Sequence, residues 1–356
     1  MDLFSYFFVG VAVLVVWTAL NAIYPHLGWR VWVWIVYHLI AIKSIAEDIY
    51  FRSRQKVIDC SDKTGCVAVV TGGGRGLGYH VVRGLVEKGM HVVVGVRNPH
   101  NCKSMEKVFQ EEGLKGTVEV LILDTSSMKS VQEFALAVRS AHPAIHVLVN
   151  NAAQVYGEYE ETVDVFENKL ATNYLGHFLL THSLMGSLER GGRERGENSR
   201  VVNVSSCSHV LLDSIKLDDM NMRQCYCRLW VYAHTKLAQV SIPTTSGSRE
   251  RKMRELAGLP VRSSALHPGI VASNMTQDLK DSVVAPVTKL MKTEAEGALS
   301  ALYCALDRAT ESGADYISNM REWGTSSGSK DVDKQKELFE LTCKMLKIDS
   351  FGSNIE

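Results

Sequence analysis

The 356-residue sequence lacks three features that would point to a nucleic-acid partner, a disulfide-stabilised fold or a zinc site. Its 39 basic and 39 acidic residues give a net charge of +0, so nothing in the overall charge attracts nucleic acid. Its eight cysteines are scattered, and a chain of this length does not need disulfides to be stable. Cys225 and Cys227 have no second pair at zinc-finger spacing, so we expect reduced thiols and no metal site.

Charged residues are also absent from Leu3 to Leu27, a run long enough to cross a bilayer. A cleaved signal peptide would start with basic residues, whereas this chain starts Met1-Asp2. The next apolar stretch, WRVWVWIVYHLIAI, is rich in tryptophan, which suggests an interfacial segment or the returning arm of a hairpin. Basic residues follow it, at Lys43, Arg52, Arg54, Lys56 and Lys63. The positive-inside bias therefore predicts a main domain that faces the cytosol.

From about residue 64 onward, short apolar strands alternate with amphipathic helices. The predicted strands cover 66–71, 91–96, 118–123, 145–150, 200–205 and 261–266. Because these runs are apolar throughout, each strand should be buried on both faces in a parallel sheet covered by helices. We therefore predict an α/β fold, a doubly wound parallel sheet of the Rossmann type in a single domain over 64–356. An N-terminal membrane anchor (1–45, one span or a hairpin) and a basic linker (46–63) should precede it.

The glycine-rich turn TGGGRGLG (71–78) lacks the G-x-G-x-x-G spacing of the long dinucleotide fingerprint and the Gly-Lys-Ser/Thr of a P-loop. Its spacing is T-G-x-x-x-G-x-G, through Thr71, Gly72, Gly76 and Gly78. A strand, a glycine turn and a helix N-terminus place several free N–H groups and the positive end of the helix dipole against one phosphate group. A purely structural tight turn is the alternative interpretation.

An acidic residue is missing after the second strand, where NAD-preferring proteins hydrogen-bond the ribose 2′-hydroxyl. Arg97 ends that strand instead, and Arg75 lies inside the glycine turn. Two guanidinium groups suit a 2′-phosphate, which a carboxylate would repel. The sequence therefore favours NADP(H), with NAD(H) possible, unless both are ordinary solvated arginines.

A tyrosine and a lysine, Tyr232 and Lys236, lie one helical turn apart downstream of Ser205 and Ser206. A tyrosine of pKa near 10 is a poor base at neutral pH unless a neighbouring cation favours its phenolate, and a lysine ammonium supplies that cation. The same pair occurs on ordinary amphipathic helices, so the glycine turn and the serine pair are needed to give it a catalytic interpretation.

Six motifs in order resemble the short-chain dehydrogenase/reductase family over residues 64 to 350. They are TGGGRGLG, NNAA (150–153), ATNYLGHFLLT (171–181), RVVNVSS (200–206), YAHTK (232–236) and HPGIVAS (267–273). Within the family, the phrases NYLGHFLLT, SRVVNVSS, LDDM and ELTCKMLKI are similar to the membrane-anchored retinol dehydrogenase branch, and most similar to its polyprenol dehydrogenase and dolichal reductase type.

The resemblance implies catalytic roles for four residues. Tyr232 would be the general acid/base, and Ser206 would hold the substrate oxygen. Lys236 would hydrogen-bond the nicotinamide ribose and favour the phenolate, and Asn173 would anchor a proton-relay water. Hydride would move between the nicotinamide and the carbinol carbon while Tyr232 moves the proton.

The resemblance also implies a cofactor site. Asp124 would lie beside the adenine, Asn150 would close the floor of the site, and His267 would border the nicotinamide. The implied cofactor-binding residues are Thr71, Gly72, Gly74, Arg75, Gly76, Leu77, Gly78, Arg97, Asp124, Thr125, Asn150, Ala152, Tyr232, Lys236, Pro268, Gly269, Val271 and Ser273.

The function implied is NAD(P)(H)-dependent interconversion of a lipophilic alcohol and its aldehyde or ketone, of the polyprenol/dolichal or retinol/retinal type, at the endoplasmic reticulum membrane. A catalytically idle cofactor-binding membrane protein of the same fold is the alternative. Pro243, in IPTTSGSRERK, interrupts the helix that carries Tyr232. Relatives commonly form a subunit interface with that helix, so a homodimer stays open.

Overall fold

The computed structural model describes residues 25–102, 104–224, 226–241, 259–273, 285–310 and 316–352. Most of the charge-free run Leu3–Leu27 lies outside these ranges, as do Cys225 and the stretch around Pro243. No interpretation of those segments is tested by the described residues.

One eight-stranded sheet forms the centre of the molecule, in the order β3-β2-β1-β4-β5-β6-β7-β8. Its strands are β1 (Val67–Thr71), β2 (His91–Val96), β3 (Thr117–Ile122), β4 (Val147–Asn150), β5 (Ser199–Val204), β6 (Val261–His267), β7 (Tyr316–Ser318) and β8 (Arg321–Glu322). Neighbouring strands are parallel except β7 and β8, which are antiparallel. The predicted doubly wound parallel sheet is confirmed, and the strand order reverses between β1 and β4.

The six predicted strands are all present, within two residues of their expected bounds. Their side chains pack on both faces of the sheet, which is why the sequence runs are apolar throughout. The short strands β7 and β8 and the antiparallel edge they form were not predicted.

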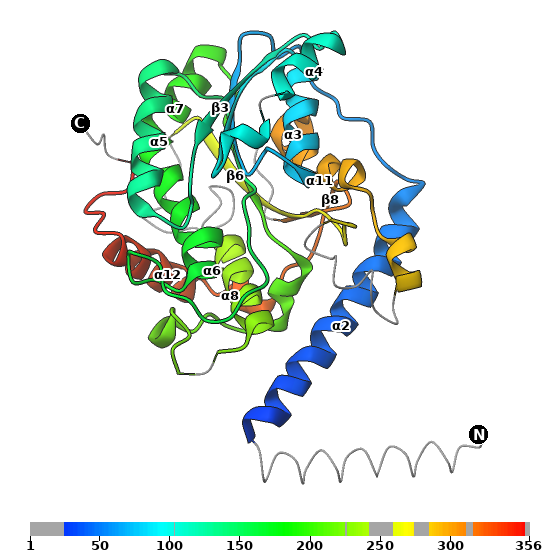
Figure 1. Cartoon of the computed structure of the whole chain (residues 1–356), viewed down its shortest axis with the longest axis vertical. Coiled ribbons are helices and arrows are strands. Elements are labelled where there is room, and N and C mark those ends of the chain that lie inside the picture. Colours follow the sequence, from blue (N-terminus) through cyan, green and yellow to red (C-terminus); the bar gives the residue numbers. More distant parts are fainter. Residues whose placement is uncertain are drawn as a thin grey trace.

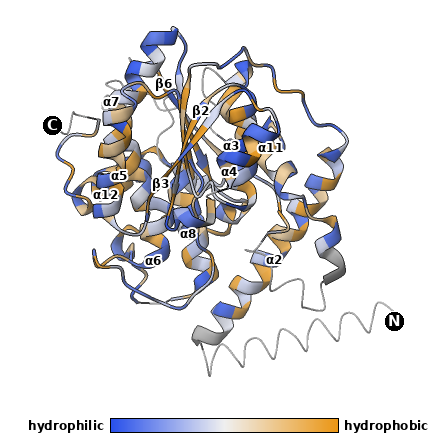
Figure 2. Cartoon of the chain, turned by 45° about the horizontal axis from the view of Figure 1, so that its top comes forward, coloured by the Kyte–Doolittle hydropathy of each residue, from blue (hydrophilic) through white to orange (hydrophobic). Residues whose placement is uncertain are grey.

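Helices cover both faces of the sheet (Figure 1). Within the described ranges the α-helices are α2 (Pro25–Arg52), α3 (Gly76–Glu87), α4 (Met105–Glu111), α5 (Met128–Ala141), α6 (Asn168–Leu170), α7 (Gly176–Arg195), α8 (Arg228–Ser241), α11 (Glu294–Leu306) and α12 (Val332–Met345). Buried side chains of α3, α4 and α11 pack on one face, and those of α5 and α7 pack on the other. Figure 2 shows the hydrophobic strands enclosed between these two layers.

Helix α2 is continuous from the second apolar stretch through Arg52, past the predicted anchor boundary at residue 45. By length and composition, Gly28–Arg52 could cross a membrane. In the structure, however, one side of the helix packs on the short helix Cys207–Leu211 and on α8. Trp29 packs edge-on against Trp230, and Arg30 donates to the Tyr226 carbonyl at 2.8 Å. Helix α2 is therefore docked on the main domain.

Candidate active site

The carboxyl ends of β1, β4, β5 and β6 lie side by side and carry most of the predicted site. Asn150 ends β4 and pairs in register with Asn203 of β5. Its amide nitrogen donates to the side-chain oxygen of Asn203 at 2.9 Å and to the Thr181 hydroxyl at 3.2 Å. Its own amide oxygen is buried with no hydrogen-bond partner among the described residues. A buried acceptor of this kind is available to a ligand at the floor of the crevice.

The glycine turn after β1 depends on two features that only glycine provides. Gly72 and Gly76 have φ values of +67° and +61°, in the left-handed region. At Gly78, a Cβ would lie 2.3 Å from the Gly72 carbonyl oxygen. The turn is therefore packed tightly against the first turn of α3.

The N-terminus of α3 is suited to an anion. Arg75 is its N-cap residue, but no side chain caps the helix, and its first turn holds no acidic residue. Its first N–H groups therefore remain available, at the positive end of the dipole. Glu294 of α11 lies nearby: its Oε1 would be 3.4 Å from a Cβ on Gly76. Sequence reasoning missed this carboxylate, which follows the glycine turn by more than 200 positions.

The Thr71 hydroxyl joins the glycine turn to the segment after β4. Its oxygen accepts the backbone N–H groups of Asn151 and Ala152 at 2.9 and 3.0 Å and lies 2.9 Å from His177 Nε2. The other ring nitrogen of His177 hydrogen-bonds the Asn173 carbonyl at 3.0 Å. Thr71 thus contributes to the shape of the predicted cofactor site by fixing two of its loops.

The predicted adenosine side of the site lies at the ends of β2 and β3. Arg75 and Arg97 are both exposed, and neither guanidinium group makes a hydrogen bond or ion pair with a described residue. They follow Gly74 and Val96, which are in contact: a Cβ on Gly74 would lie 3.2 Å from Val96 Cγ1. Both arginines therefore extend from the same corner of the sheet edge.

The segment after β3 completes this corner. One Asp124 carboxylate oxygen accepts the N–H and the hydroxyl of Ser126 at 2.9 and 2.7 Å. The buried Thr125 has its carbonyl pressed against the start of α7, where a Cβ on Gly176 would lie 2.0 Å from that oxygen. The predicted adenine-side residues are thus fixed by local hydrogen bonds and by the start of α7.

The catalytic residues predicted from the sequence meet at the ends of β5 and α8. The Ser206 hydroxyl lies beside the Tyr232 phenol, and its polar contact lowers the pKa of that phenol. Lys236 Nζ lies 5.6 Å from the centre of the Tyr232 ring and donates to the Val204 carbonyl and the Gln239 amide oxygen, both at 2.8 Å. Tyr232 and Lys236 are only 7% and 1% exposed, so water is largely excluded from the pair. Gln239 is a partner that sequence reasoning missed.

Burial sets the protonation of this pair. Removal from water raises the pKa of the Tyr232 phenol well above its ordinary value, and the polar contact with Ser206 opposes this only in part. Burial lowers the pKa of the Lys236 ammonium to about 7. The phenol therefore keeps its proton at neutral pH. The expectation that the lysine would favour a phenolate stays a prediction.

Asn173 lies in a π-helical turn, Ala171–Leu175, between α6 and α7. Its side chain accepts the Gln154 N–H at 2.8 Å and donates to the Gln154 carbonyl at 2.9 Å and to the Thr235 hydroxyl at 3.1 Å. Thr235 precedes Lys236 on α8, so Asn173 fixes the catalytic helix relative to α7. π-turns of this kind are frequent at functional sites. The role of Asn173 in holding a proton-relay water stays a prediction.

The loop after β6 carries the residues expected to border the nicotinamide. A Cβ on Gly297 of α11 would lie 2.6 Å from Val271 and 3.2 Å from Leu77, so these two predicted cofactor residues meet beneath α11. Ser273 is the last described residue of the loop.

Two charged side chains close around this loop at Gly269. Its φ is +95°, and a Cβ there would lie 2.6 Å from Lys292 and 2.7 Å from Asp48. Lys292 Nζ also donates to the Pro268 carbonyl at 3.3 Å. Sequence reasoning missed both charged residues, and Asp48 belongs to α2, which was predicted to be part of the membrane anchor and linker.

Comparison with known proteins agrees with this geometry. A family model described as short chain dehydrogenase matches residues 66–213. The polyprenol dehydrogenase of Danio rerio is 34% identical over 314 residues, which cover 87% of this chain and 95% of that protein. The chain belongs to the short-chain dehydrogenase/reductase family. The retinol dehydrogenase 12 of Bos taurus is 33% identical to this family member over 287 residues, 80% of this chain and 87% of that one.

Solved structures agree with the family assignment. An uncharacterized protein from Mycobacterium paratuberculosis is 29% identical, with a TM-score of 0.63 over 81% of this chain and 96% of that one. The Pseudomonas aeruginosa RhlG/NADP active-site complex shares the fold at 22% identity and a TM-score of 0.55, over 71% of this chain and 94% of that one. The protein is therefore a short-chain dehydrogenase/reductase of the retinol dehydrogenase-like branch, an oxidoreductase family that uses a nicotinamide cofactor.

Proposed function

We propose that this short-chain dehydrogenase/reductase reduces a lipophilic aldehyde to its alcohol with NADPH at a membrane surface, and oxidises the alcohol in the reverse direction. The observation that carries this proposal is the placement of the Ser206 hydroxyl beside the Tyr232 phenol, with the buried Lys236 Nζ 5.6 Å from the centre of the Tyr232 ring. Two hydroxyl groups converge at the carboxyl edge of the sheet, where ligands of this fold bind.

The chain's residues supply binding, orientation and a proton. When bound, the cofactor supplies or accepts the hydride. The hydroxyls of Ser206 and Tyr232 both donate to the substrate carbonyl oxygen, which orients the carbonyl and polarises it. Tyr232, protonated at neutral pH, then gives its proton to the developing alkoxide. Lys236, held by Val204 and Gln239, places a cation beneath the phenolate that forms. In the oxidising direction the same phenolate takes the alcohol proton.

The cofactor site fits a phosphorylated dinucleotide. The N-terminus of α3 has no side-chain cap and no acidic residue in its first turn, so its N–H groups can bind the pyrophosphate, and the amide oxygen of Asn150 is buried without a partner among the described residues. Arg75 and Arg97 are exposed at the ribose corner, where no acidic residue follows β2. These features support NADP(H) over NAD(H).

A lipophilic substrate is supported by the relatives and by α2. The named relatives are a polyprenol dehydrogenase and a retinol dehydrogenase, and both names denote long apolar alcohols. The outward side of α2 exposes apolar residues: Val31, Trp32, Trp34, Ile35, Leu39, Ile42 and Ile49. Tryptophan-rich apolar faces suit the bilayer interface, here at the endoplasmic reticulum with the catalytic domain on the cytosolic side. A substrate could then enter from the lipid.

The test is NADPH oxidation by the full-length, detergent-solubilised protein with retinal, dolichal and a steroid ketone. Tyr232→Phe should reduce kcat roughly 10²- to 10⁴-fold, the usual contribution of a general acid. Tyr159→Phe, on a surface loop, is the matched control and should change little. Wild-type protein that binds NADPH but reduces no member of the panel would instead support the idle alternative.

A further inference from the structure

Helix α2 presents two buried polar side chains to the catalytic domain. Ser44 and Asp48 are 3% and 0% exposed and lie one helical turn apart, so they point in the same direction. The surrounding α2 residues that face the domain are apolar, and a lipid anchor or an ordinary packing face has no need of a buried carboxylate. The burial of these two polar side chains is therefore explained only by the groups that they contact.

Ser44 connects α2 to the end of β6 and, through His267, to the loop after β5. Its hydroxyl lies 2.8 Å from His267 Nε2, and His267 Nδ1 accepts the backbone N–H of Cys207 at 3.1 Å. Because Nδ1 accepts, Nε2 carries the proton and donates to Ser44. Burial lowers the pKa of His267 to about 4, so the ring is neutral at pH 7, as this tautomer requires. Cys207 directly follows Ser206, so Ser44 is one side chain away from the catalytic loop.

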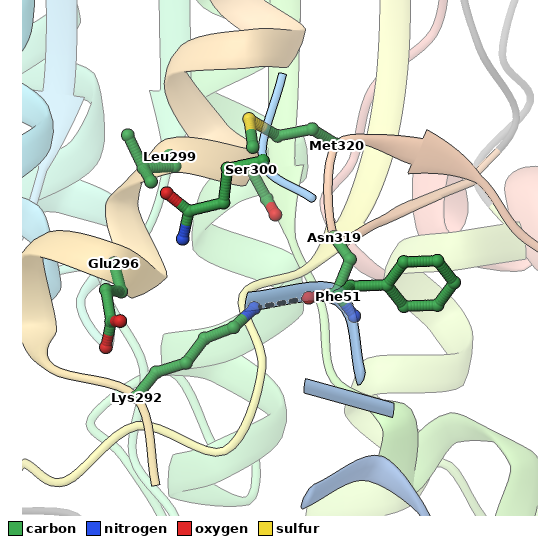
Figure 3. A pocket seen from close by; sticks show the side chains of 8 residues that line it. Phe51, Lys292, Glu296, Leu299, Ser300, Asn319 and Met320 are labelled. Atoms are coloured by element: carbon green, nitrogen blue, oxygen red, sulfur yellow. Dashed lines mark hydrogen bonds between the residues drawn. The ribbon is translucent and has the colours of Figure 1, made fainter. Parts of the chain in front are cut away.

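Asp48 holds the loop that is expected to border the nicotinamide. One carboxylate oxygen accepts the Ile270 N–H at 2.8 Å, and the other lies 3.1 Å from Lys292 Nζ. Lys292 is itself 3% exposed and donates to the Asn319 side chain at 2.8 Å and to the Pro268 carbonyl at 3.3 Å. Figure 3 shows the lysine reaching Asn319 at the turn between β7 and β8. The loop is thereby clamped from α2 on one side and from the sheet edge on the other.

We propose that Ser44 and Asp48 are positioning residues of the active site, and that α2 is part of the catalytic unit as well as of the membrane attachment. Ser44 fixes His267 against the Ser206–Cys207 backbone, and Asp48 with Lys292 fixes residues 268–270. Hydride transfer depends on the angle and distance between nicotinamide and carbonyl, to which small displacements are costly. This inference rests on the proposed function.

The test compares Asp48→Asn and Ser44→Ala in the full-length protein with Lys43→Ala, whose side chain is 77% exposed on the same helix. Asparagine can still accept the Ile270 N–H but leaves Lys292 without its counter-ion. We expect kcat for the aldehyde to fall at least tenfold in Asp48→Asn and severalfold in Ser44→Ala, with the aldehyde KM unchanged within about threefold, because a displacement of about 1 Å can cost up to 10²-fold in rate. Lys43→Ala should match the wild type.

A fall in kcat with an unchanged KM distinguishes a role in positioning the active site from a role in stabilising the fold. Variants that unfold more easily but turn over normally per folded molecule would overturn the inference. If Asp48→Asn fails to fold, Ser44→Ala alone decides, because it removes one hydroxyl group. If the wild type reduces no aldehyde, the proposed function fails instead, and NADPH binding decides: a dissociation constant unchanged in both variants would then overturn the role of α2.

A second, independent feature lies at the opposite end of β2 and β3, away from the cofactor edge. His91 begins β2, Glu119 lies in β3, and His142 follows the end of α5. His91 pairs with Thr117 in register, so His91 and Glu119 share the face of the sheet on which α5 packs. Each of the three side chains offers one possible ligand atom, and these three atoms all lie within 4.8 Å of one another.

The local contacts resemble those of a metal site. Glu119 Oε2 lies 3.0 Å from His142 Nε2 and 3.5 Å from His91 Nε2, close to the separation of about 3.3 Å between ligands with bonds near 2 Å to one zinc ion. The other nitrogen of His91 lies 2.7 Å from the Thr117 hydroxyl, an outer contact of the kind that orients a metal-bound imidazole. Its Nε2 is buried and makes no hydrogen bond within the described chain.

We infer that His91, Glu119 and His142 bind one Zn²⁺, with water as the fourth ligand, and that the ion joins β2, β3 and α5. Calorimetric titration of the full-length protein with ZnCl₂ should give one ion per chain. His91→Gln and His142→Gln should each weaken binding at least tenfold, whereas the exposed His100→Gln should not. Binding that is absent, or unchanged in the His91→Gln/His142→Gln double variant, would overturn the inference.

Discussion

At the scale of single residues, the proposed preference for NADP(H) rests on two arginines, Arg75 and Arg97, whose guanidinium groups have no partner in the described structure. Each charge-assisted hydrogen bond to a 2′-phosphate contributes about 1.5–3 kcal/mol. We therefore expect Arg75→Ala and Arg97→Ala each to raise the NADPH dissociation constant roughly 10- to 100-fold, as measured by fluorescence titration, while NADH binding changes little. Arg83→Ala, on the outer side of α3 and paired with Glu112, is the control. Equal losses for NADPH and NADH would contradict the proposed contact.

Removing the carboxylate of Glu294 should strengthen NADPH binding, whereas removing either arginine should weaken it. It lies beside the glycine turn, where the pyrophosphate is proposed to bind, and like charges there oppose each other. Glu294→Gln removes the repulsion and should tighten NADPH binding about two- to fivefold, the range expected for a charge at a helix N-terminus. Glu337→Gln on α12 should have no effect. Weaker binding in Glu294→Gln would mean that the carboxylate contacts the cofactor favourably.

At the scale of elements, the contact between the glycine turn and α3 should control cofactor binding. In Gly78→Ala the new methyl group would meet the Gly72 carbonyl, so α3 must move away from the turn. We expect NADPH binding to weaken more than tenfold, together with a loss of roughly 1–3 kcal/mol of stability from the crowding. Gly324→Ala, where no atom lies within 4 Å of the added Cβ, is the matched control in binding and thermal-unfolding measurements.

The elements also indicate what the sequence could and could not predict. Strands such as Val67–Thr71 and His91–Val96 were recognisable because burial on both faces leaves a continuous apolar run. Strands β7 and β8 have three and two residues, too few for any periodic pattern. Helix α2 was found by hydrophobicity, but the role of Ser44 was hidden because its partner His267 follows 223 residues later. The local sequence pattern therefore predicts the strands and helices, but the candidate active site is built by contacts between segments that are far apart in the sequence.

At the scale of the whole molecule, buried histidines couple stability to pH. Burial lowers the pKa of His177, His209, His234 and His267 to about 4 each. In the unfolded chain these rings titrate near 6.5, so between pH 4 and 6.5 the unfolded state binds more protons than the folded state. The stability contributed by their neutral forms is complete above pH 6.5 and is lost as the pH falls towards 4.

Thermal or denaturant unfolding measured from pH 4 to 9 should therefore show a steep loss of stability on the acid side. Each histidine adds at most about 1.4 kcal/mol per pH unit to that slope. His234→Gln keeps an acceptor for the Lys216 N–H and removes one titrating ring, so it should reduce the acid slope by about that amount. An acid slope that is unchanged in His234→Gln would mean that other groups, such as paired carboxylates, control acid unfolding.

Lys236, whose pKa burial lowers to about 7, should make stability rise further between pH 7 and about 10, where the unfolded chain still holds its proton. In Lys236→Met that alkaline rise should disappear while the acid slope stays.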